Sequence, residues 1–183
     1  YKHEKVFKFL HLCLQSGCNK VLKIMHRGYT AEDFIYYVEE FRKEIPEMTL
    51  LTDIIVGHPG EDEEDFQATL NLIKRVKPDL FNVSKFGARP GTAAAKMKQI
   101  EPRIIDERSK ILHNLVRKIG LRNNKKWLGW KGKIIVDEEV NDAVEGRNFA
   151  YKPIVLKEKI NLGNFVDVKI VDAKSNYLVG KLQ

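Results

Sequence analysis

Two cysteines and a histidine near the start of the chain have side chains that commonly bind metals. His11 and Cys13 are separated by one residue in "HLCLQSGCNK", and Cys18 follows in the same stretch. Two cysteines in 183 residues are too few for a disulfide framework. Two thiols and one imidazole also fall short of the four ligands of a closed zinc or iron–sulfur site. We therefore expect no metal ligand in this chain and interpret the cysteines as small, buried side chains near a strand end.

Three glycine-containing loops carry other polar groups that could bind a ligand. They read "QSGCN", "GHPGE" and "GARPGTAAA", and each follows a segment with the composition of a strand. Glycine lets a backbone approach a ligand closely. The polar side chains in or beside these loops belong to Gln15, Ser16, His58, Glu61, Arg89 and Thr92. Tight turns alone would explain one such loop, but three at the same end of parallel strands favour a ligand-binding face.

Two charged residues outside these loops are also candidates. Asp53 lies within a predicted strand, where a carboxylate that faces the interior needs a partner. Arg27 in "MHRGY" is suited to a carboxylate or phosphate, although a solvated surface arginine is an equal alternative. "GHPGED" lacks the spacing and lysine of a phosphate-binding P-loop. Residue types and spacing thus predict a ligand-binding face without identifying the ligand.

The elements that position these residues alternate between strand and helix. We expect strands at residues 6–15, 50–57 and 79–86, with apolar runs typical of strands covered on both faces. We expect helices that begin after Thr30, in the acidic run from Asp62 and near Pro102. This α/β order predicts parallel strands joined by right-handed crossovers. Three such units are half of an eight-fold barrel, whose full form takes about 250 residues, so we expect a C-terminal piece of a longer polypeptide.

After Lys126 the sequence changes to short β-type runs separated by turn residues. Five strands are expected, at residues 132–137, 143–151, 153–156, 165–171 and 177–182. This strand count is typical of a small antiparallel barrel of the oligonucleotide-binding type. The basic link "RNNKKW" marks the boundary, which gives expected domains at residues 1–124 and 125–183.

Charge and hydropathy limit the classes of partner. The net charge of +7 is compatible with nucleic acid but does not require it. No apolar run reaches the roughly 18 to 20 residues of a membrane span, and "YKHEKVFKFL" lacks the apolar core of a signal peptide. We therefore expect a cytoplasmic protein without membrane partners.

Four segments together resemble the radical S-adenosylmethionine methylthiotransferases. They are "HLCLQSGCNKVLKIMHRGYT", "TDIIVGHPGEDEEDF", "NVSKFGARPGTAAAKM" and "ERSKILHNL", and the resemblance covers essentially the whole chain. The forms "NVSKFGARPGT" and "MKQI" look most like the archaeal and eukaryotic branch, which modifies N6-threonylcarbamoyladenosine beside the tRNA anticodon. The resemblance implies addition of a methylthio group to C2 of this adenine, half of a radical S-adenosylmethionine barrel, and a C-terminal barrel of the TRAM type.

The resemblance also implies S-adenosylmethionine and two 4Fe–4S clusters as cofactors. In that family one cluster is held by a Cys-x-x-x-Cys-x-x-Cys motif and cleaves S-adenosylmethionine, and the second is held by cysteines of an N-terminal domain. This chain contains neither motif. We therefore expect cluster ligands outside this chain, no catalytic residue within it, and no activity from these 183 residues alone. The electron donor and the sulfur source are not assigned.

By this resemblance the candidate ligands of S-adenosylmethionine fall into groups along the chain. The set comprises Gln15, Ser16 and Gly17 near the methionine or ribose, Arg27 at the methionyl carboxylate, Asp53, Gly57 and Glu61 at the exit of the second strand, and Ala88, Arg89, Pro90 and Gly91 near the adenine. The family usually reads His-x-Pro-x-Gln-Ser-Gly-Ser at the first loop. Cys13 thus replaces a frequent proline, Cys18 a frequent serine and, in the second loop, His58 a frequent phenylalanine.

The C-terminal barrel contains the candidate RNA-binding residues. Those for phosphates are Lys125, Lys126, Lys131, Lys133, Arg147, Lys152 and Lys169, and those for stacking on bases are Trp127, Trp130, Phe149 and Tyr151. For the tryptophans and Phe149 the alternative is packing in the core or between domains. Two other functions stay open, namely methylthiolation of a ribosomal protein and RNA binding without catalysis.

Overall fold

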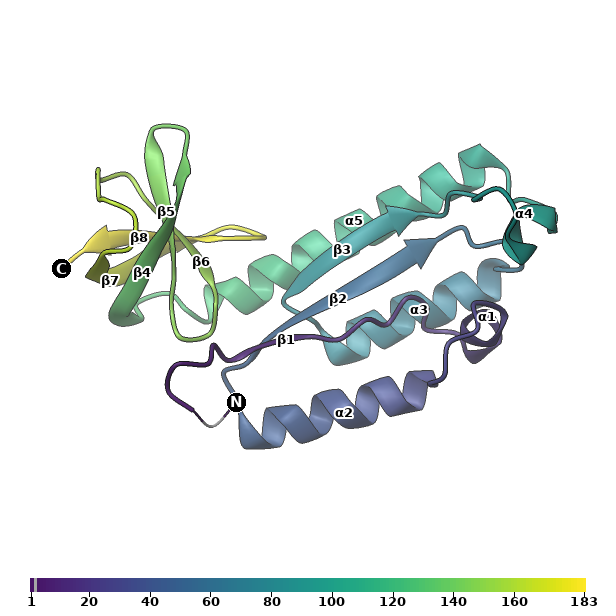
Figure 1. Ribbon diagram of the computed structural model, residues 1–183, viewed down its shortest axis with the longest axis horizontal. Helices are drawn as coiled ribbons and strands as arrows, with labels where there is room; N and C mark the ends of the chain where they lie inside the picture. The colour runs from purple at the N-terminus through teal and green to yellow at the C-terminus, as the bar shows by residue number, and fades with distance from the viewer. Residues whose placement is uncertain (2) are drawn as a thin grey trace.

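Three parallel strands form the sheet of the first part of the chain (Figure 1). The computed structural model describes Tyr1 and residues 3–183. The strands are β1 (Phe9–His11), β2 (Thr49–Val56) and β3 (Leu80–Lys85), paired in that order. β1 is shorter than predicted because regular pairing stops after His11, and a single further bridge joins Gln15 to Ile54. The predicted parallel α/β arrangement is confirmed.

Three long helices cover one face of this sheet. They are α2 (Ala31–Glu44), α3 (Glu63–Val76) and α5 (Pro102–Lys125), and they share one hydrophobic core with the sheet. Local capping explains where α2 and α3 begin. Thr30 forms a capping box with Asp33, and Asp62 forms one with Asp65. Two short helices, α1 (Asn19–Ile24) and α4 (Ala93–Lys96), lie in segments for which no helix was predicted.

The two faces of the sheet differ in burial. Along β2, Leu50, Ile54 and Val56 are buried against the helices, whereas Asp53 and Ile55 are only half-buried on the opposite face. Successive strand residues point to opposite faces, which produces this alternation. Within the described residues, helices cover only one face of the sheet. The half-exposed side is called the open face below.

Five further strands close into a small barrel with its own apolar core. They are β4 (Lys131–Val140), β5 (Ala143–Arg147), β6 (Pro153–Leu156), β7 (Phe165–Ala173) and β8 (Leu178–Leu182), in the closed order β4-β5-β6-β8-β7. β5 ends earlier than predicted because Asn148 Oδ1 accepts hydrogen bonds from Ala150 N and Lys152 N, both at 3.0 Å, which turns the chain. One pair, β6 with β8, is parallel, so the barrel is not wholly antiparallel as predicted.

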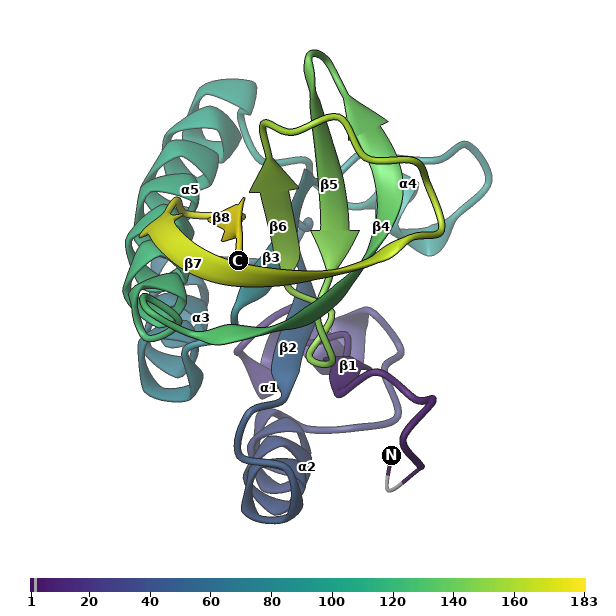
Figure 2. The same ribbon diagram turned by 90° about the vertical axis from the view of Figure 1, so that its left-hand side faces the viewer.

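The barrel lies beyond the N-terminal ends of β2 and β3, and α5 runs from the opposite end of the sheet to reach it (Figure 1). Figure 2 views the molecule from the barrel end, with the sheet behind. Asn124 Nδ2 near the end of α5 donates to the carbonyl of Lys174 at 2.9 Å, which ties this helix to the barrel. Within the described part of the chain, no helix is long and apolar enough to cross a membrane.

Candidate functional site

A hollow of about 1050 Å³ lies along the open face, between β2, β3 and the loop that follows β3. Four of the residues predicted to bind S-adenosylmethionine line it, namely Gln15, Arg27, Asp53 and Arg89. Thr92 and Asn82, from the third loop and from β3, line it as well. The structure thus brings together polar groups from three separate segments, as expected for loops at one end of parallel strands.

The side chain of Asp53 makes three hydrogen bonds in this hollow. Its Oδ2 accepts hydrogen bonds from Cys13 Sγ at 2.9 Å and from His11 Nε2 at 3.0 Å, while Oδ1 accepts one from Asn82 Nδ2 at 2.8 Å. Burial acts to raise the pKa of Asp53, but these hydrogen bonds outweigh it and the pKa lies below its usual value. Asp53 is therefore a carboxylate at neutral pH. Its bonds to His11, Cys13 and Asn82 provide the polar partners that the sequence analysis expected for a carboxylate within a strand.

Gln15 holds the first loop against β2 through its backbone. Its N–H donates to the carbonyl of Asp53 at 2.8 Å, and its own carbonyl accepts from Ile55 N at 2.9 Å. Gln15 has a left-handed backbone with φ of 65° and is 7% exposed. Residues other than glycine rarely adopt a left-handed backbone, and those that do are concentrated at functional sites.

Ser16 and Gly17 turn away from the hollow and pack on α3. The backbone N–H of Gly17 donates to Thr69 Oγ1 at 2.9 Å, and Ser16 Oγ lies 3.4 Å from the same atom. A Cβ on Gly17 would stand 2.5 Å from Thr69 Cα, so only glycine fits this contact. In this structure both residues position the loop and do not line the hollow.

The second loop is tied to α5 by a buried ion pair. Glu61 is 5% exposed, and its Oε1 accepts from Arg108 Nη1 at 2.8 Å and from Gly57 N at 3.2 Å. Burial raises the pKa of Glu61, and the bonds from Gly57 and Arg108 oppose this rise only in part. Gly57 has φ of 81° and its backbone faces Ile105. Glu61 and Gly57 therefore shape the loop from behind, and their predicted contact with a cofactor stays a prediction.

The third loop lies exposed at the rim of the hollow. Arg89, Ala88, Pro90 and Gly91 are all exposed, and Gly91 has φ of 83°. Thr92 fixes the loop because its hydroxyl donates to the carbonyl of Arg89 at 2.8 Å and caps α4. The Arg89 side chain is the one of these four that lines the hollow.

The hollow fits the organic part of S-adenosylmethionine but not an iron–sulfur cluster. Its volume suits a ligand of that size, Arg27 and Arg89 offer positive charge for a carboxylate, and Asp53 offers negative charge for an ammonium group. The two cysteines do not converge, since Cys13 donates to Asp53 and Cys18 donates to Asp65, each at 2.9 Å. A cluster needs several thiolates around one centre, so the described residues do not provide one.

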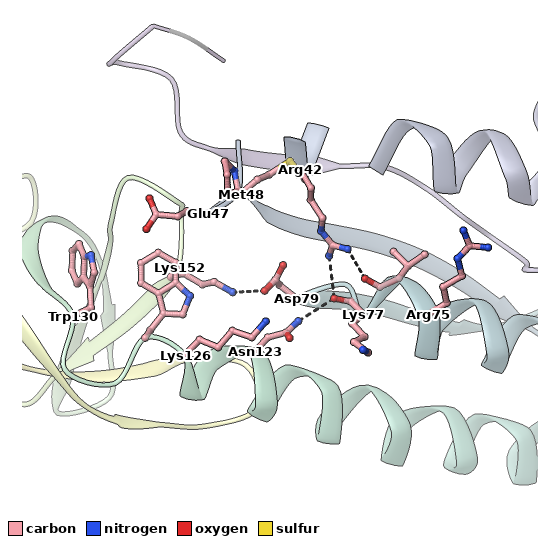
Figure 3. Close-up of a pocket in the computed structure, with 13 residues that line it drawn as sticks. Arg42, Glu47, Met48, Arg75, Lys77, Asp79, Asn123, Lys126, Trp130 and Lys152 are labelled. Atoms are coloured by element: carbon pink, nitrogen blue, oxygen red, sulfur yellow. Dashed lines mark hydrogen bonds and ion pairs between the residues drawn. The ribbon is translucent and has the colours of Figure 1, made fainter. Parts of the chain in front are cut away.

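A second pocket, of about 510 Å³, lies at the junction between the sheet and the barrel (Figure 3). The candidate RNA-binding residues that line it are Lys126, Trp127, Trp130 and Lys152, and Arg42 and Lys77 from the ends of α2 and α3 line it as well. Lys152 is 2% exposed and its ammonium is bonded to Asp79, so it is not available to a phosphate in this structure.

The remaining basic candidates are either exposed to solvent or bonded to carboxylates of the protein. Lys125, Lys126, Lys131, Lys133 and Lys169 are exposed, and Lys131 stands opposite Lys169 in the β4–β7 register. Arg147 is instead bonded to Asp137 and Glu145, at 3.2 and 2.6 Å, and lies over the Tyr151 ring. Five lysines are therefore exposed, while Arg147 and Lys152 are bonded to carboxylates of the protein.

Three of the four aromatic candidates pack against one another, and the fourth, Tyr151, packs against Phe7 and Phe9. The ring centroids of Trp127 and Trp130 are 5.8 Å apart, and Phe149 lies 5.9 and 6.3 Å from them. Both tryptophans contact the barrel core. The two tryptophans and Phe149 therefore pack within the protein, which was the alternative to stacking on bases, although Phe149 is 38% exposed.

Sequence reasoning missed the bonding of His11, Asn82 and Arg108. His11 and Asn82 point to the same face as Asp53, which strand alternation would predict once the register is known. Arg108 falls within the apolar stripe of α5, between Ile105 and Leu112, where a charge signals a buried ion pair.

Comparison with known proteins agrees with these features. Residues 2–73 match the model of the radical SAM superfamily. Coproporphyrinogen III oxidase from Escherichia coli, a radical SAM enzyme, has a similar fold, with a TM-score of 0.53 and 17% identity over 97% of this chain and 46% of that protein. The parallel sheet therefore has the fold of a radical SAM protein.

The curated relatives align with the whole chain. Probable threonylcarbamoyladenosine tRNA methylthiotransferases of Pyrococcus horikoshii and Methanocaldococcus jannaschii are each 46% identical to it over 183 residues. A tRNA-2-methylthio-N(6)-dimethylallyladenosine synthase of Caldicellulosiruptor saccharolyticus is 38% identical over 98% of the chain. The chain spans 43%, 42% and 39% of these proteins, which is less than half of each. The chain is thus similar over its whole length to part of proteins named as tRNA methylthiotransferases.

Proposed function

We propose that this chain is part of a tRNA methylthiotransferase that adds a methylthio group to C2 of N6-threonylcarbamoyladenosine beside the anticodon. The observation that carries the proposal is the 44–46% identity, over the entire chain, to archaeal proteins named for this activity. The hollow supports it, because polar groups of the first and third loops meet Asp53 of β2 and Asn82 of β3 at one cavity, which suits a cofactor site.

In this proposal the chain binds and orients S-adenosylmethionine. The guanidinium group of Arg27 holds the methionyl carboxylate, Arg89 lies near the adenine, and the Asp53 carboxylate holds a cationic part of the ligand. Gln15 presents its amide from a fixed loop. S-adenosylmethionine supplies the methyl group and the radical when bound, and the two 4Fe–4S clusters of the proposal have their ligands outside these residues.

The closed barrel is proposed to be an RNA-binding module of the TRAM type. Its five strands and its exposed lysines suit a fold that binds nucleic acid through phosphates. We place the division into domains at residues 1–124 and 125–183, because α5 ends at Lys125 and the barrel begins at Lys131. The proposed partners are tRNA and S-adenosylmethionine, and the proposed location is the cytoplasm.

Mass analysis of tRNA nucleosides tests the function. Cells that lack the gene should lose 2-methylthio-N6-threonylcarbamoyladenosine and accumulate its precursor without the methylthio group. The wild-type gene should restore the modification. Unchanged tRNA with loss of a methylthio group from a ribosomal protein would instead favour the second enzymatic function. Loss of 2-methylthio-N6-dimethylallyladenosine would point to the substrate in the name of the bacterial relative, and no change in any of these would favour a binding module.

A further inference from the structure

Three side chains with metal-binding atoms meet on the open face, at His11, Cys13 and Asp53, and are called the His–Cys–Asp cluster below. Cys13 Sγ and His11 Nε2 both approach the same oxygen, Asp53 Oδ2, at 2.9 and 3.0 Å, and lie 3.8 Å from each other. The ligand atoms of all three therefore lie within 4.8 Å of one another. A thiol, an imidazole and a carboxylate are the three kinds of side chain that bind zinc in proteins.

These separations are close to those that a tetrahedral ion imposes. Zinc bonds of about 2.0 to 2.3 Å at tetrahedral angles place the ligand atoms about 3.4 to 3.6 Å apart. The 3.8 Å between Cys13 Sγ and His11 Nε2 is slightly wider, and the two contacts to Asp53 are shorter because hydrogen atoms occupy them. Side-chain movements well below 1 Å would therefore admit the ion.

Strand pairing fixes the cluster in place. The carbonyl of Leu51 accepts from Leu12 N at 3.0 Å and the carbonyl of Asp53 accepts from Gln15 N at 2.8 Å, which holds Cys13 beside Asp53. Asn82, the register partner of Asp53, donates to its Oδ1 at 2.8 Å. Such an outer bond orients a ligating carboxylate and leaves the other oxygen directed at the metal.

We propose that His11, Cys13 and Asp53 bind one zinc ion, with the fourth coordination position open to the hollow. The thiolate and imidazole select borderline ions such as zinc over magnesium or calcium. The side chain of His11 is 41% exposed, so the ion can enter from solvent. Sequence reasoning considered His11 and Cys13 as metal ligands but missed Asp53 as the third, because Asp53 lies 42 and 40 positions from them.

Cys18 is the internal control that the chain provides. Its thiol also donates to a carboxylate, Asp65 Oδ1, at 2.9 Å. Asp65 Oδ2 accepts from Asp62 N and is also paired with the ammonium group of Lys20, whose positive charge repels a metal ion. Among the residues that the structure describes, Cys18 therefore has the same thiol–carboxylate pair as Cys13 but no third ligand.

Zinc titration of the metal-free 183-residue chain by calorimetry tests the site. The wild type and Cys18→Ser should each bind one equivalent, and Cys13→Ser should bind at least about tenfold more weakly. Cobalt should give a sulfur-to-metal charge-transfer band in the wild type and in Cys18→Ser but not in Cys13→Ser. Asn82→Ala, which removes only the outer bond, should weaken binding about tenfold or more.

The outcomes separate this site from a general loss of structure. Circular dichroism should show that Cys13→Ser and Asp53→Asn fold like the wild type; if Cys13→Ser does not fold, the decision rests on Asp53→Asn and on the cobalt band of the wild type. Absence of zinc binding by the wild type, or equal affinities in Cys13→Ser and Cys18→Ser, would overturn the proposal. The test uses neither S-adenosylmethionine nor tRNA, so its failure and the failure of the proposed function are distinguishable. Zinc would occupy the Asp53 carboxylate that the proposed function assigns to S-adenosylmethionine, so the two ligands would compete for Asp53.

Discussion

Lys152 Nζ lies 2.9 Å from Asp79 Oδ1, and this ion pair joins the barrel to the sheet. The two side chains are only 2% and 12% exposed, and Asn124 Oδ1 accepts a further bond from Lys152 at 3.3 Å. Figure 3 shows the pair among the residues that line the junction pocket. The barrel therefore docks through a charge pair that water does not reach freely.

Removal of this ammonium should strongly destabilise the protein. Lys152→Met leaves the Asp79 carboxylate buried without its partner, which we expect to cost about 3–5 kcal/mol. The control is Lys169→Met, at an exposed position on β7, which should change stability by less than about 0.5 kcal/mol. Urea denaturation provides both values. Equal stability of the two variants would show that the pair contributes nothing at the junction.

A methyl group at Gly17 should also be costly. Gly17→Ala places a Cβ 2.5 Å from Thr69 Cα, where the neighbour is backbone and cannot rotate away. We expect a loss of about 1–3 kcal/mol in the free energy of unfolding. Gly28→Ala is the matched control, because its Cβ would meet nothing within 4 Å. The prediction fails if both substitutions have the same small effect in denaturation.

Acid should weaken the fold in part through His58. Burial lowers the pKa of His58 below its usual 6.5, so the folded state resists a proton that the unfolded state accepts. The stability due to neutral His58 is present above pH 6.5 and is lost as the pH falls below this value. His58→Phe should therefore flatten the decline in unfolding free energy on the acid side of pH 6.5.

The control for this pH dependence is His3→Phe, at an exposed position. It should leave the pH profile unchanged, whereas His58→Phe should alter it. Phenylalanine can keep the ring contact with Phe86, whose centroid lies 4.9 Å from that of His58. Parallel pH profiles for the wild type and His58→Phe would contradict the assignment.

The exposed lysines at the start of the barrel should act together in tRNA binding. Glutamate at Lys125, Lys126, Lys131 and Lys133 should weaken tRNA affinity and flatten its dependence on salt, since each lost phosphate contact reduces the slope by somewhat less than one. Filter binding over a range of salt concentrations measures both quantities. The control replaces four exposed lysines of the α/β part with glutamate and so has the same net charge: Lys5, Lys23, Lys43 and Lys74. Identical affinity and slope in the two variants would exclude a specific basic surface.

Local sequence signals predicted the three long helices α2, α3 and α5, but not the short helices α1 and α4. Thr30 with Asp33 and Asp62 with Asp65 form capping boxes between residues three apart, so the sequence alone marks where α2 and α3 begin. β5 was predicted too long because the Asn148 turn depends on side-chain hydrogen bonds that no apolar pattern reveals.

The candidate site was harder to predict because its contacts are distant in sequence. Asp53 was recognised as a carboxylate in need of a partner, but its partners His11 and Cys13 lie 42 and 40 positions away. The register of β1 on β2 decides which of these residues meet, and register is a property of the folded sheet. Lys152 was assigned to RNA for the same reason, since Asp79 lies 73 positions from it.

One rigid element connects the two ends of the molecule. Near its start, α5 contacts the second loop through Ile105 and Arg108, and near its end Asn124 bonds to the barrel. Its 24 residues span about 36 Å at a rise of 1.5 Å each. The length of α5 therefore sets the distance between the second loop and the barrel. If the barrel holds RNA as proposed, the length of α5 would set the distance in space that a nucleotide must cover between the barrel and the hollow.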